Sequence, residues 1–315
     1  MENKKFFVTM LAVAFCMALA AVNLSAQGWT AIPTPPPLDE HQYGVTHGDS
    51  LWVIVGDTVG EGGLVKTSPD GINWTKRNPY VAQSLNSVAY GNNMFVAVGH
   101  CGRIIISPDG ITWTKRTPNP ATTQNFQCVA HGDTLFVVVG DNGMIYTSPN
   151  GTIWTARDSG VSTRLNGVCY SEALGLWVIV GYEGVILTSE DGINWTDRSL
   201  SAPYYLFQVV YGDYDGLFVA TSKNGAVFIS ENGISWNKRN PGVTSEHLYG
   251  ITYGHAMYMA VGNFGAVISS LDGRTWSLEV DPPLTDEPLW SVAYDTAANR
   301  FVAVGQNIIL YSGVY

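Results

Sequence analysis

The chain has 315 residues, of which 46% are hydrophobic and 12% aromatic, and its 16 basic and 26 acidic side chains give a formal net charge of −10. A surface of this charge repels phosphate groups, which argues against nucleic acid and anionic membrane as partners. The 34 glycines and the low share of charged residues, 13%, predict many turns and short strands rather than helices.

The first residues resemble a secretory signal. Lys4 and Lys5 precede an apolar run over residues 6–24, which ends in a small-residue cleavage pattern. We therefore expect a signal peptide over residues 1–26 and a mature chain that is secreted or periplasmic. No later apolar run reaches transmembrane length, so we expect no membrane span in the mature chain.

Beyond the signal, the sequence repeats with a period of about 40 residues. Each period contains four short β-rich runs separated by turn signals, and none of them has helical periodicity. Four-stranded antiparallel sheets repeated radially form a β-propeller, so we expect an all-β fold with seven blades over residues 27–315. The innermost strands are expected at residues 42–47, 85–90, 126–131, 165–170, 206–211, 248–253 and 289–294.

The seventh period is incomplete, because it reaches Tyr315 without the Trp-Thr strand that ends the other blades. That strand is present near the start of the mature chain, at Gly28-Trp29-Thr30-Ala31. Pairing it with the last blade would complete the seventh sheet and remove an open sheet edge. We therefore expect the N-terminal strand to close the ring.

The other six blades share a turn of the type Ser68-Pro69-Asp70-Gly71, followed three residues later by Trp74. Pro presets φ, Asp or Asn bonds neighbouring amides, and Gly supplies the positive φ that returns the chain to the sheet. We call this unit the aspartate turn. Because it recurs in most blades, we expect its acidic or amide residue to be structural: Asp70, Asp109, Asn150, Asp191, Asn232 and Asp272.

Residues 68–74 resemble the Asp-box, or bacterial neuraminidase repeat, of the form Ser-x-Asp-x-Gly-x-x-Trp, with one residue fewer between Asp and Gly. With the preceding Val-Gly-x-x-Gly-x-Ile pattern and seven blades, the chain is more similar to the photosystem II assembly-factor group than to the sialidases of that superfamily. The resemblance implies a propeller whose Asp-box is a structural turn remote from the active centre.

Sialidase chemistry is not expected, although the resemblance includes that superfamily. It requires three arginines that converge on the substrate carboxylate, whereas Arg103, Arg164 and Arg300 lie in three different contexts. The remaining arginines of the series occupy one position on the outermost strands, where we expect them to pair with carboxylates or cover tryptophan faces: Arg77, Arg116, Arg157, Arg198 and Arg239. We therefore assign no catalytic residue.

Histidine and cysteine give no sign of a metal site or a cofactor. His47 and His131 stand where the other blades have tyrosine, so we interpret them as structural. The mature chain has Cys101, Cys128 and Cys169, which we expect to be free thiols, with a Cys128–Cys169 disulfide as the alternative. No Cys-x-x-Cys pair is present, and we expect neither a metal nor a cofactor.

One position near the start of each innermost strand differs in residue type between blades. A ligand contacts one face of a ring, so its contacts should vary, whereas scaffold residues recur. Aromatic faces suit sugars and amides suit hydroxyls, so this set could line a site for a glycan or a peptide, or could simply plug the axial funnel. Its members are Tyr43, Asn86, Gln127, Asn166, Phe207, Tyr249 and Trp290.

These features predict a monomeric, exported, non-catalytic binding or scaffold module with a glycan or protein partner. One alternative is a glycoside hydrolase of sialidase-like fold, which needs two carboxylates near the axis about 5–10 Å apart. Glu40, Glu246, Asp286 and Glu287 are the candidates for that pair. A second alternative, an assembly factor for an exported or membrane complex, is implied by the resemblance alone.

Overall fold

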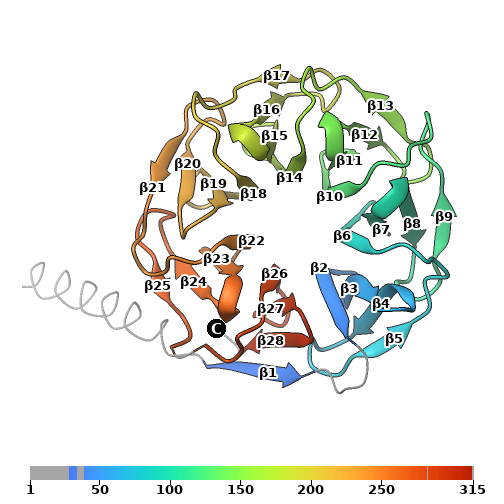
Figure 1. Cartoon of the computed structure of the whole chain (residues 1–315), viewed down its shortest axis with the longest axis horizontal. Helices are drawn as coiled ribbons and strands as arrows, with labels where there is room; N and C mark the ends of the chain where they lie inside the picture. The colour runs from blue at the N-terminus through green and yellow to red at the C-terminus, as the bar shows by residue number, and fades with distance from the viewer. Residues whose placement is uncertain (1–27, 34–38, 282, 314–315) are drawn as a thin grey trace, which may run out of the picture.

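Seven four-stranded antiparallel sheets stand around one axis in the computed structural model, which describes residues 28–33, 39–281 and 283–313 (Figure 1). The all-β, seven-bladed propeller predicted from the sequence is confirmed. The predicted signal peptide at residues 1–26 lies outside the described residues.

Within the part of the chain that the structure describes, no helix combines the length and the apolar character needed to cross a membrane.

In the first six blades the strands run outward from the axis in chain order, and in the seventh the outermost strand is the first of the chain (Figure 1). The first three blades comprise β2 (Glu40–Gly48), β3 (Leu51–Thr58), β4 (Gly62–Ser68) and β5 (Thr75–Arg77); β6 (Leu85–Gly91), β7 (Met94–Gly99), β8 (Arg103–Ser107) and β9 (Thr114–Arg116); and β10 (Phe126–Gly132), β11 (Leu135–Gly140), β12 (Ile145–Ser148) and β13 (Thr155–Arg157).

Blades four to seven follow the same order. They comprise β14 (Leu165–Ser171), β15 (Leu176–Gly181), β16 (Ile186–Ser189) and β17 (Thr196–Asp197); β18 (Leu206–Gly212), β19 (Leu217–Ser222), β20 (Val227–Ser230) and β21 (Asn237–Arg239); β22 (Leu248–Gly254), β23 (Met257–Gly262), β24 (Val267–Ser270) and β25 (Ser277–Leu278); and β26 (Leu289–Asp295), β27 (Arg300–Gly305) and β28 (Ile308–Ser312).

The seventh blade is completed by β1 (Trp29–Pro33), as the sequence predicts. This strand pairs antiparallel with β28, from Trp29 opposite Ser312 to Pro33 opposite Ile308. Trp29 is buried in the core cluster shared by blades six and seven, where Leu310 also lies. The two ends of the described chain therefore belong to one sheet.

Single turns of 3-10 helix join the second and third strands in four blades, where the sequence predicts simple turns. In η2, Asn142 adopts a φ of 56° and Gly143 one of 70°. A Cβ on Gly143 would lie 2.0 Å from the carbonyl oxygen of Val161, so glycine is required where the next loop crosses the turn. The four elements are η1 (His100–Gly102), η2 (Asp141–Gly143), η3 (Tyr182–Gly184) and η4 (Asn263–Gly265).

An aromatic ring pair occurs in every blade near the end of the first strand, and His47 and His131 take part in it. His47 packs 4.9 Å from Trp52, as Tyr90 packs 4.6 Å from Phe95. The Tyr90 ring of blade two lies against Gly48, the last residue of the first strand in blade one. The equivalent last residue in blade seven, next to His47, is Asp295, and its Oδ1 lies 3.4 Å from His47 Nδ1.

The contact with Asp295 explains why blade one has a histidine, His47, where most blades have a tyrosine. Burial lowers the pKa of His47, and Asp295 opposes that shift only in part. The ring is therefore neutral near pH 7 and fills the position of the tyrosine. Both histidines occupy the structural position that the sequence predicts.

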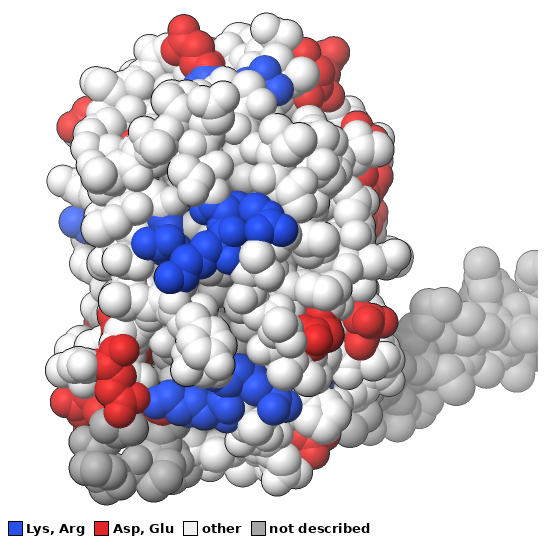
Figure 2. Space-filling model, turned by 90° about the vertical axis from the view of Figure 1, so that its right-hand side faces the viewer, with Lys and Arg blue, Asp and Glu red and all other residues white. Residues whose placement is uncertain are grey.

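The basic residues of the outermost strands lie on the rim of the ring. Figure 2 shows the side on which β5 and β9 lie, where the blue Lys and Arg side chains form groups that uncharged surface separates. The expected pairing of the rim arginines with carboxylates or tryptophan faces is wrong for the described residues. Arg77 and Arg157 instead donate Nε–H to the hydroxyls of Thr67 and Thr147, each at 2.9 Å, because each threonine lies two residues from the strand partner of its arginine.

The aspartate turns are held by bonds to one carboxylate or amide oxygen. Asp109 Oδ1 accepts the backbone N–H of Ile111 at 2.9 Å and of Thr112 at 2.8 Å, together with the hydroxyl of Ser107 at 2.9 Å. The N–H of Thr112, opposed in part by burial and supported by that of Ile111, holds the pKa of Asp109 below its usual value. Trp113 Nε1 then bonds the carbonyl oxygen of Gly110 at 3.0 Å.

We expect Asp109→Ala to lower the free energy of unfolding by about 1 kcal/mol, because the turn loses its shared acceptor while its N–H groups stay open to solvent. Urea unfolding at pH 7 measures this change. Asp109→Asn is the matched control and should stay near the parent, since Asn150 and Asn232 accept the same pair of N–H bonds. Equal stability of the Ala variant and the parent would contradict a structural role.

The pH dependence of the same comparison gives a second check on Asp109. Its folded-state pKa is depressed, so its contribution is fully present above the unfolded value of about 3.9 and is lost as the pH falls through the folded value. The stability difference between the parent and Asp109→Ala should therefore shrink in acid.

Candidate binding site at the axis

The seven variable residues lie where the first strand of each blade is irregular. In blade two, Leu85 pairs with Gly99 and Ser87 with Val98, so Asn86 has no strand partner. A register shift occurs at the same place in the other six first strands, and in blade five it spans both Phe207 and Gln208. A β-bulge interrupts the in-and-out alternation of side chains along a strand. Here it turns the variable residue toward the mouth of the ring.

All seven side chains line one pocket of about 380 Å³ at the axis. Its further lining residues are His100, Asn125, Arg164 and Tyr182. A second cavity of about 200 Å³ lies along the first strands, and the same seven side chains line it as well. The set therefore separates the mouth pocket from the inner part of the axial channel, and we call it the axial ring.

The inner cavity is narrow because the first strands approach one another closely at the axis. Small residues that follow the axial ring in most of these strands allow this approach. A Cβ on Gly44 or Gly250 would come within 3.0 Å of the neighbouring strand. Gln208 of blade five is the large exception, and its Nε2 reaches Cys128 Sγ of blade three at 3.5 Å. Cys128 and Cys169 are free, and burial raises the pKa of the Cys169 thiol. Cys128 lines the inner cavity and Cys169 packs against the core between blades four and five, so the alternative disulfide is not formed.

One side of the axial ring is aromatic, over the consecutive blades five, six, seven and one. Phe207 and Tyr249 pack edge to face at 5.0 Å, and Trp290 lies 4.8 Å from Tyr43. Burial, with a smaller contribution from Asp57, raises the pKa of Tyr43 to about 12. We call these four residues the aromatic arc; its phenols are protonated at neutral pH.

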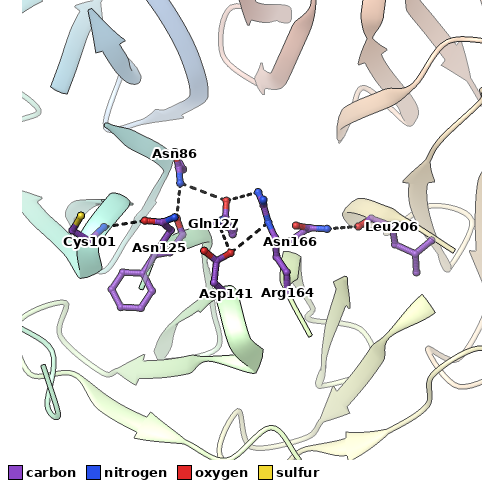
Figure 3. Close-up of polar contacts among 9 residues, drawn as sticks. Asn86, Cys101, Asn125, Gln127, Asp141, Arg164, Asn166 and Leu206 are labelled. Carbon is purple, nitrogen blue, oxygen red and sulfur yellow. Dashed lines mark hydrogen bonds and ion pairs between the residues drawn. The ribbon is translucent and has the colours of Figure 1, made fainter. Parts of the chain in front are cut away.

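The other side consists of three amides from blades two, three and four, which we call the amide arc (Figure 3). Asn86 Nδ2 donates to the carbonyl oxygen of Phe126 at 2.7 Å. Asn166 Nδ2 makes the equivalent bond to Leu206, also at 2.7 Å. Each asparagine thus holds the first strand of the next blade, and that bond fixes the direction of its amide.

Gln127 of the amide arc is bonded at both ends (Figure 3). Its Nε2 donates to Asp141 at 2.9 Å, and its Oε1 accepts from Arg164 at 2.7 Å. Arg164 Nε also lies 3.6 Å from Asp141, and the guanidinium stands 5.3 Å from the centre of the Tyr182 ring. The charge of Arg164 is therefore offset within its own cluster.

A second set of mouth residues was missed by the sequence analysis. It follows the glycine or serine at or near the end of the second strand. Asp57 bonds His41 at 2.9 Å, and the His41 ring lies 5.8 Å from Tyr43 of the axial ring. Lys223 lies 3.5 Å from the centre of the Tyr205 ring. The rule that found the axial ring would have found this position too, because its residue type also varies around the ring, and only aspartate occurs twice: Asp57, His100, Asp141, Tyr182, Lys223, Asn263 and Gln306.

None of the four carboxylates suggested for a glycosidase lines the mouth pocket. Glu40 is buried and paired with Lys66, and Asp286 is exposed. Glu246 and Glu287 use their backbone N–H groups to bond threonines of their own loops. The lining holds no carboxylate, so the pair required for glycoside hydrolysis is not assembled at this pocket.

No cluster of three or more histidine, cysteine, aspartate or glutamate residues suited to a metal ion occurs among the residues that the structure describes.

The fold and its variable mouth define a seven-bladed β-propeller with one asymmetric axial pocket. A family model described as the DUF6242 beta propeller domain matches the chain in three overlapping segments, residues 27–165, 81–206 and 107–240. The chain belongs to this family. A search of curated proteins gave no match.

Solved structures of similar fold cover nearly the whole ring. YCF48 bound to D1 peptide is 19% identical with a TM-score of 0.72, over 91% of this chain and 97% of that chain. YCF48 from Cyanidioschyzon merolae is 17% identical with a TM-score of 0.68, over 90% and 98%. Virginiamycin B lyase from Staphylococcus aureus is 10% identical with a TM-score of 0.69, over 92% and 100%. At these identities the likeness concerns the fold alone.

Proposed function

We propose that the protein is a non-catalytic binding or scaffold module that takes its partner in the axial pocket. The observation that carries this proposal is the convergence of seven bulged side chains, different from blade to blade, on one pocket of about 380 Å³. That volume lies within the range of ligand sites, about 300–1,000 Å³. A plug would need no such division into an aromatic and an amide arc.

The proposal includes a monomeric state and export, and the sequence supports the export. The predicted signal over residues 1–26 favours a secreted or periplasmic protein. We also infer that the aspartate turns are Asp-boxes of the bacterial neuraminidase type, since Ser68, Asp70, Gly71 and Trp74 follow the order of that pattern, with one residue fewer between Asp and Gly, and are joined by hydrogen bonds within the turn.

The partner is a glycan or a protein, and each has its own support. The aromatic and amide side chains favour a sugar. A role like that of an assembly factor is favoured by the neighbour YCF48, whose structure was solved with a D1 peptide. A glycoside hydrolase is the least supported alternative, because no carboxylate lines the pocket.

Trp290→Ala is expected to weaken binding of the ligand by about 1–3 kcal/mol, the usual range for an aromatic anchor in an interface. The measurement is a glycan and peptide screen on the parent and the variant side by side, with thermal melts to verify the fold. Tyr214→Ala is the matched control, because Tyr214 is 85% exposed and outside the pocket. Hits that survive Trp290→Ala, Tyr249→Ala and Phe207→Ala would place the site elsewhere.

A further inference from the structure

We infer that the axial pocket recognises a neutral sugar unit of a glycan, an inference that rests on the proposed function and narrows it. Three features of the pocket lead to this ligand class: its charge balance, the direction of its amide groups and the position of its aromatic arc. The first two weigh against charged ligands, and the third favours a ligand with an apolar face.

The charge balance favours a neutral ligand. Arg164 is the single Lys, Arg, Asp or Glu side chain among the lining residues. Its guanidinium is already bonded to Gln127 and faces Asp141 at 3.6 Å, as Figure 3 shows. The lining therefore offers no carboxylate for a cation and no converging group of cations for an anion.

The amide arc favours a ligand that donates hydrogen bonds. The Nδ2 groups of Asn86 and Asn166 are turned away to the carbonyl oxygens of the next blades. The oxygen of each amide is left as the acceptor toward the pocket, while Gln127 is bonded at both ends. Sugar hydroxyls can donate to these oxygens, whereas the carboxylate of an acidic sugar or of a peptide C-terminus only accepts.

The aromatic arc supplies the apolar side that a sugar ring requires. Trp290 with Tyr43, and Phe207 with Tyr249, form two contacting pairs on the side opposite the amides. A pyranose ring has one face of C–H groups and an edge of hydroxyls, so it can pack on an aromatic ring while its hydroxyls reach the amide oxygens. A ligand without hydrogen-bond donors would leave the oxygens of Asn86 and Asn166 unpaired.

The experiment is calorimetric titration of the full chain with neutral trisaccharides of gluco, manno, galacto and xylo configuration. Trigalacturonate is the matched acidic probe for α-1,4-linked galactotriose, since it differs only in having a carboxylate in place of the C6 hydroxymethyl group, and sialyllactose is a second acidic probe. We expect binding of at least one neutral trisaccharide and weaker binding of the acidic probes. Asn166→Leu and Trp290→Ala should each weaken the neutral ligand roughly tenfold or more.

Gln124→Leu is the control for the amide variant, because Gln124 is exposed in a neighbouring loop and outside the pocket lining. Comparison of the neutral and acidic probes on the parent needs no variant, so the test holds even where Asn166→Leu fails to fold. Preference for a peptide or an acidic probe, with loss in Trp290→Ala, would overturn the neutral-sugar inference and leave the proposed function standing. Ligands that bind independently of Trp290, Tyr249 and Phe207 would overturn both.

Discussion

Deletion of residues 27–32 is expected to lower the free energy of unfolding by more than the loss of any one core side chain. The deletion removes almost all of β1 and therefore most of its ladder with β28. It also removes the buried side chain of Trp29, for which a change to alanine alone should cost about 3–5 kcal/mol. A ring of blades held by nearest-neighbour contacts loses its closure at the same time.

Urea unfolding of the parent, the deletion variant, Trp29→Ala and Thr30→Ala measures these contributions. Thr30 is exposed in the same strand, so its change should stay within about 0.5 kcal/mol of the parent. The deletion should be more destabilising than Trp29→Ala. A deletion variant with the midpoint of the parent would show that the ring does not depend on β1.

Lys66→Met should be the most destabilising single change of a charged residue, by about 3–5 kcal/mol, because it leaves the carboxylate of Glu40 buried and unpaired. Lys66 and Glu40 are 8% and 7% exposed and form a hydrogen-bonded ion pair between β4 and β2. The backbone of Glu40 also exchanges bonds with Asn307 of blade seven, at 2.8 and 2.9 Å. The pair thus lies where the first and last blades meet.

The matched variant combines Glu40→Leu with Lys66→Met. Replacing both members of a buried pair with apolar residues is often neutral or stabilising, so the double variant should recover most of the loss or exceed the parent. Thermal melts and urea unfolding of the parent, both single variants and the double variant complete the cycle. A Lys66→Met protein as stable as the parent would mean that water reaches Glu40.

The sequence predicts the fold well because the physical requirements of a blade recur seven times. Each period repeats the alternation, the glycine turns and the tryptophan, so errors at one blade are corrected by the others. The pairing of Trp29 with the last blade was predictable because one strand was missing from one period and present elsewhere. The buried ion pair of Lys66 with Glu40 was not, since Lys66 stands at a position that is apolar in the other blades.

The site was predictable in position but not in arrangement. Variation between blades identified the axial ring, because that rule needs only aligned periods. The direction of the Asn86 and Asn166 amides could not be found this way, since their partners are backbone carbonyls that carry no sequence signal. The expected partners of the rim arginines were wrong for a related reason. Strand register brings Thr67 within reach of Arg77, and the register of paired strands cannot be read from residue types alone.

The pairing of β1 with β28 also means that this ring could be cut and rejoined at another point. A circular permutant that links residue 313 to residue 28 and opens at Gly160, where a Cβ would meet nothing within 4 Å, would contain seven uninterrupted blades. Such a chain would keep every interface between blades, but no blade would be built from both ends of the chain. The permutant therefore separates the stability that comes from joining the two chain ends in one sheet from the stability that comes from packing between blades.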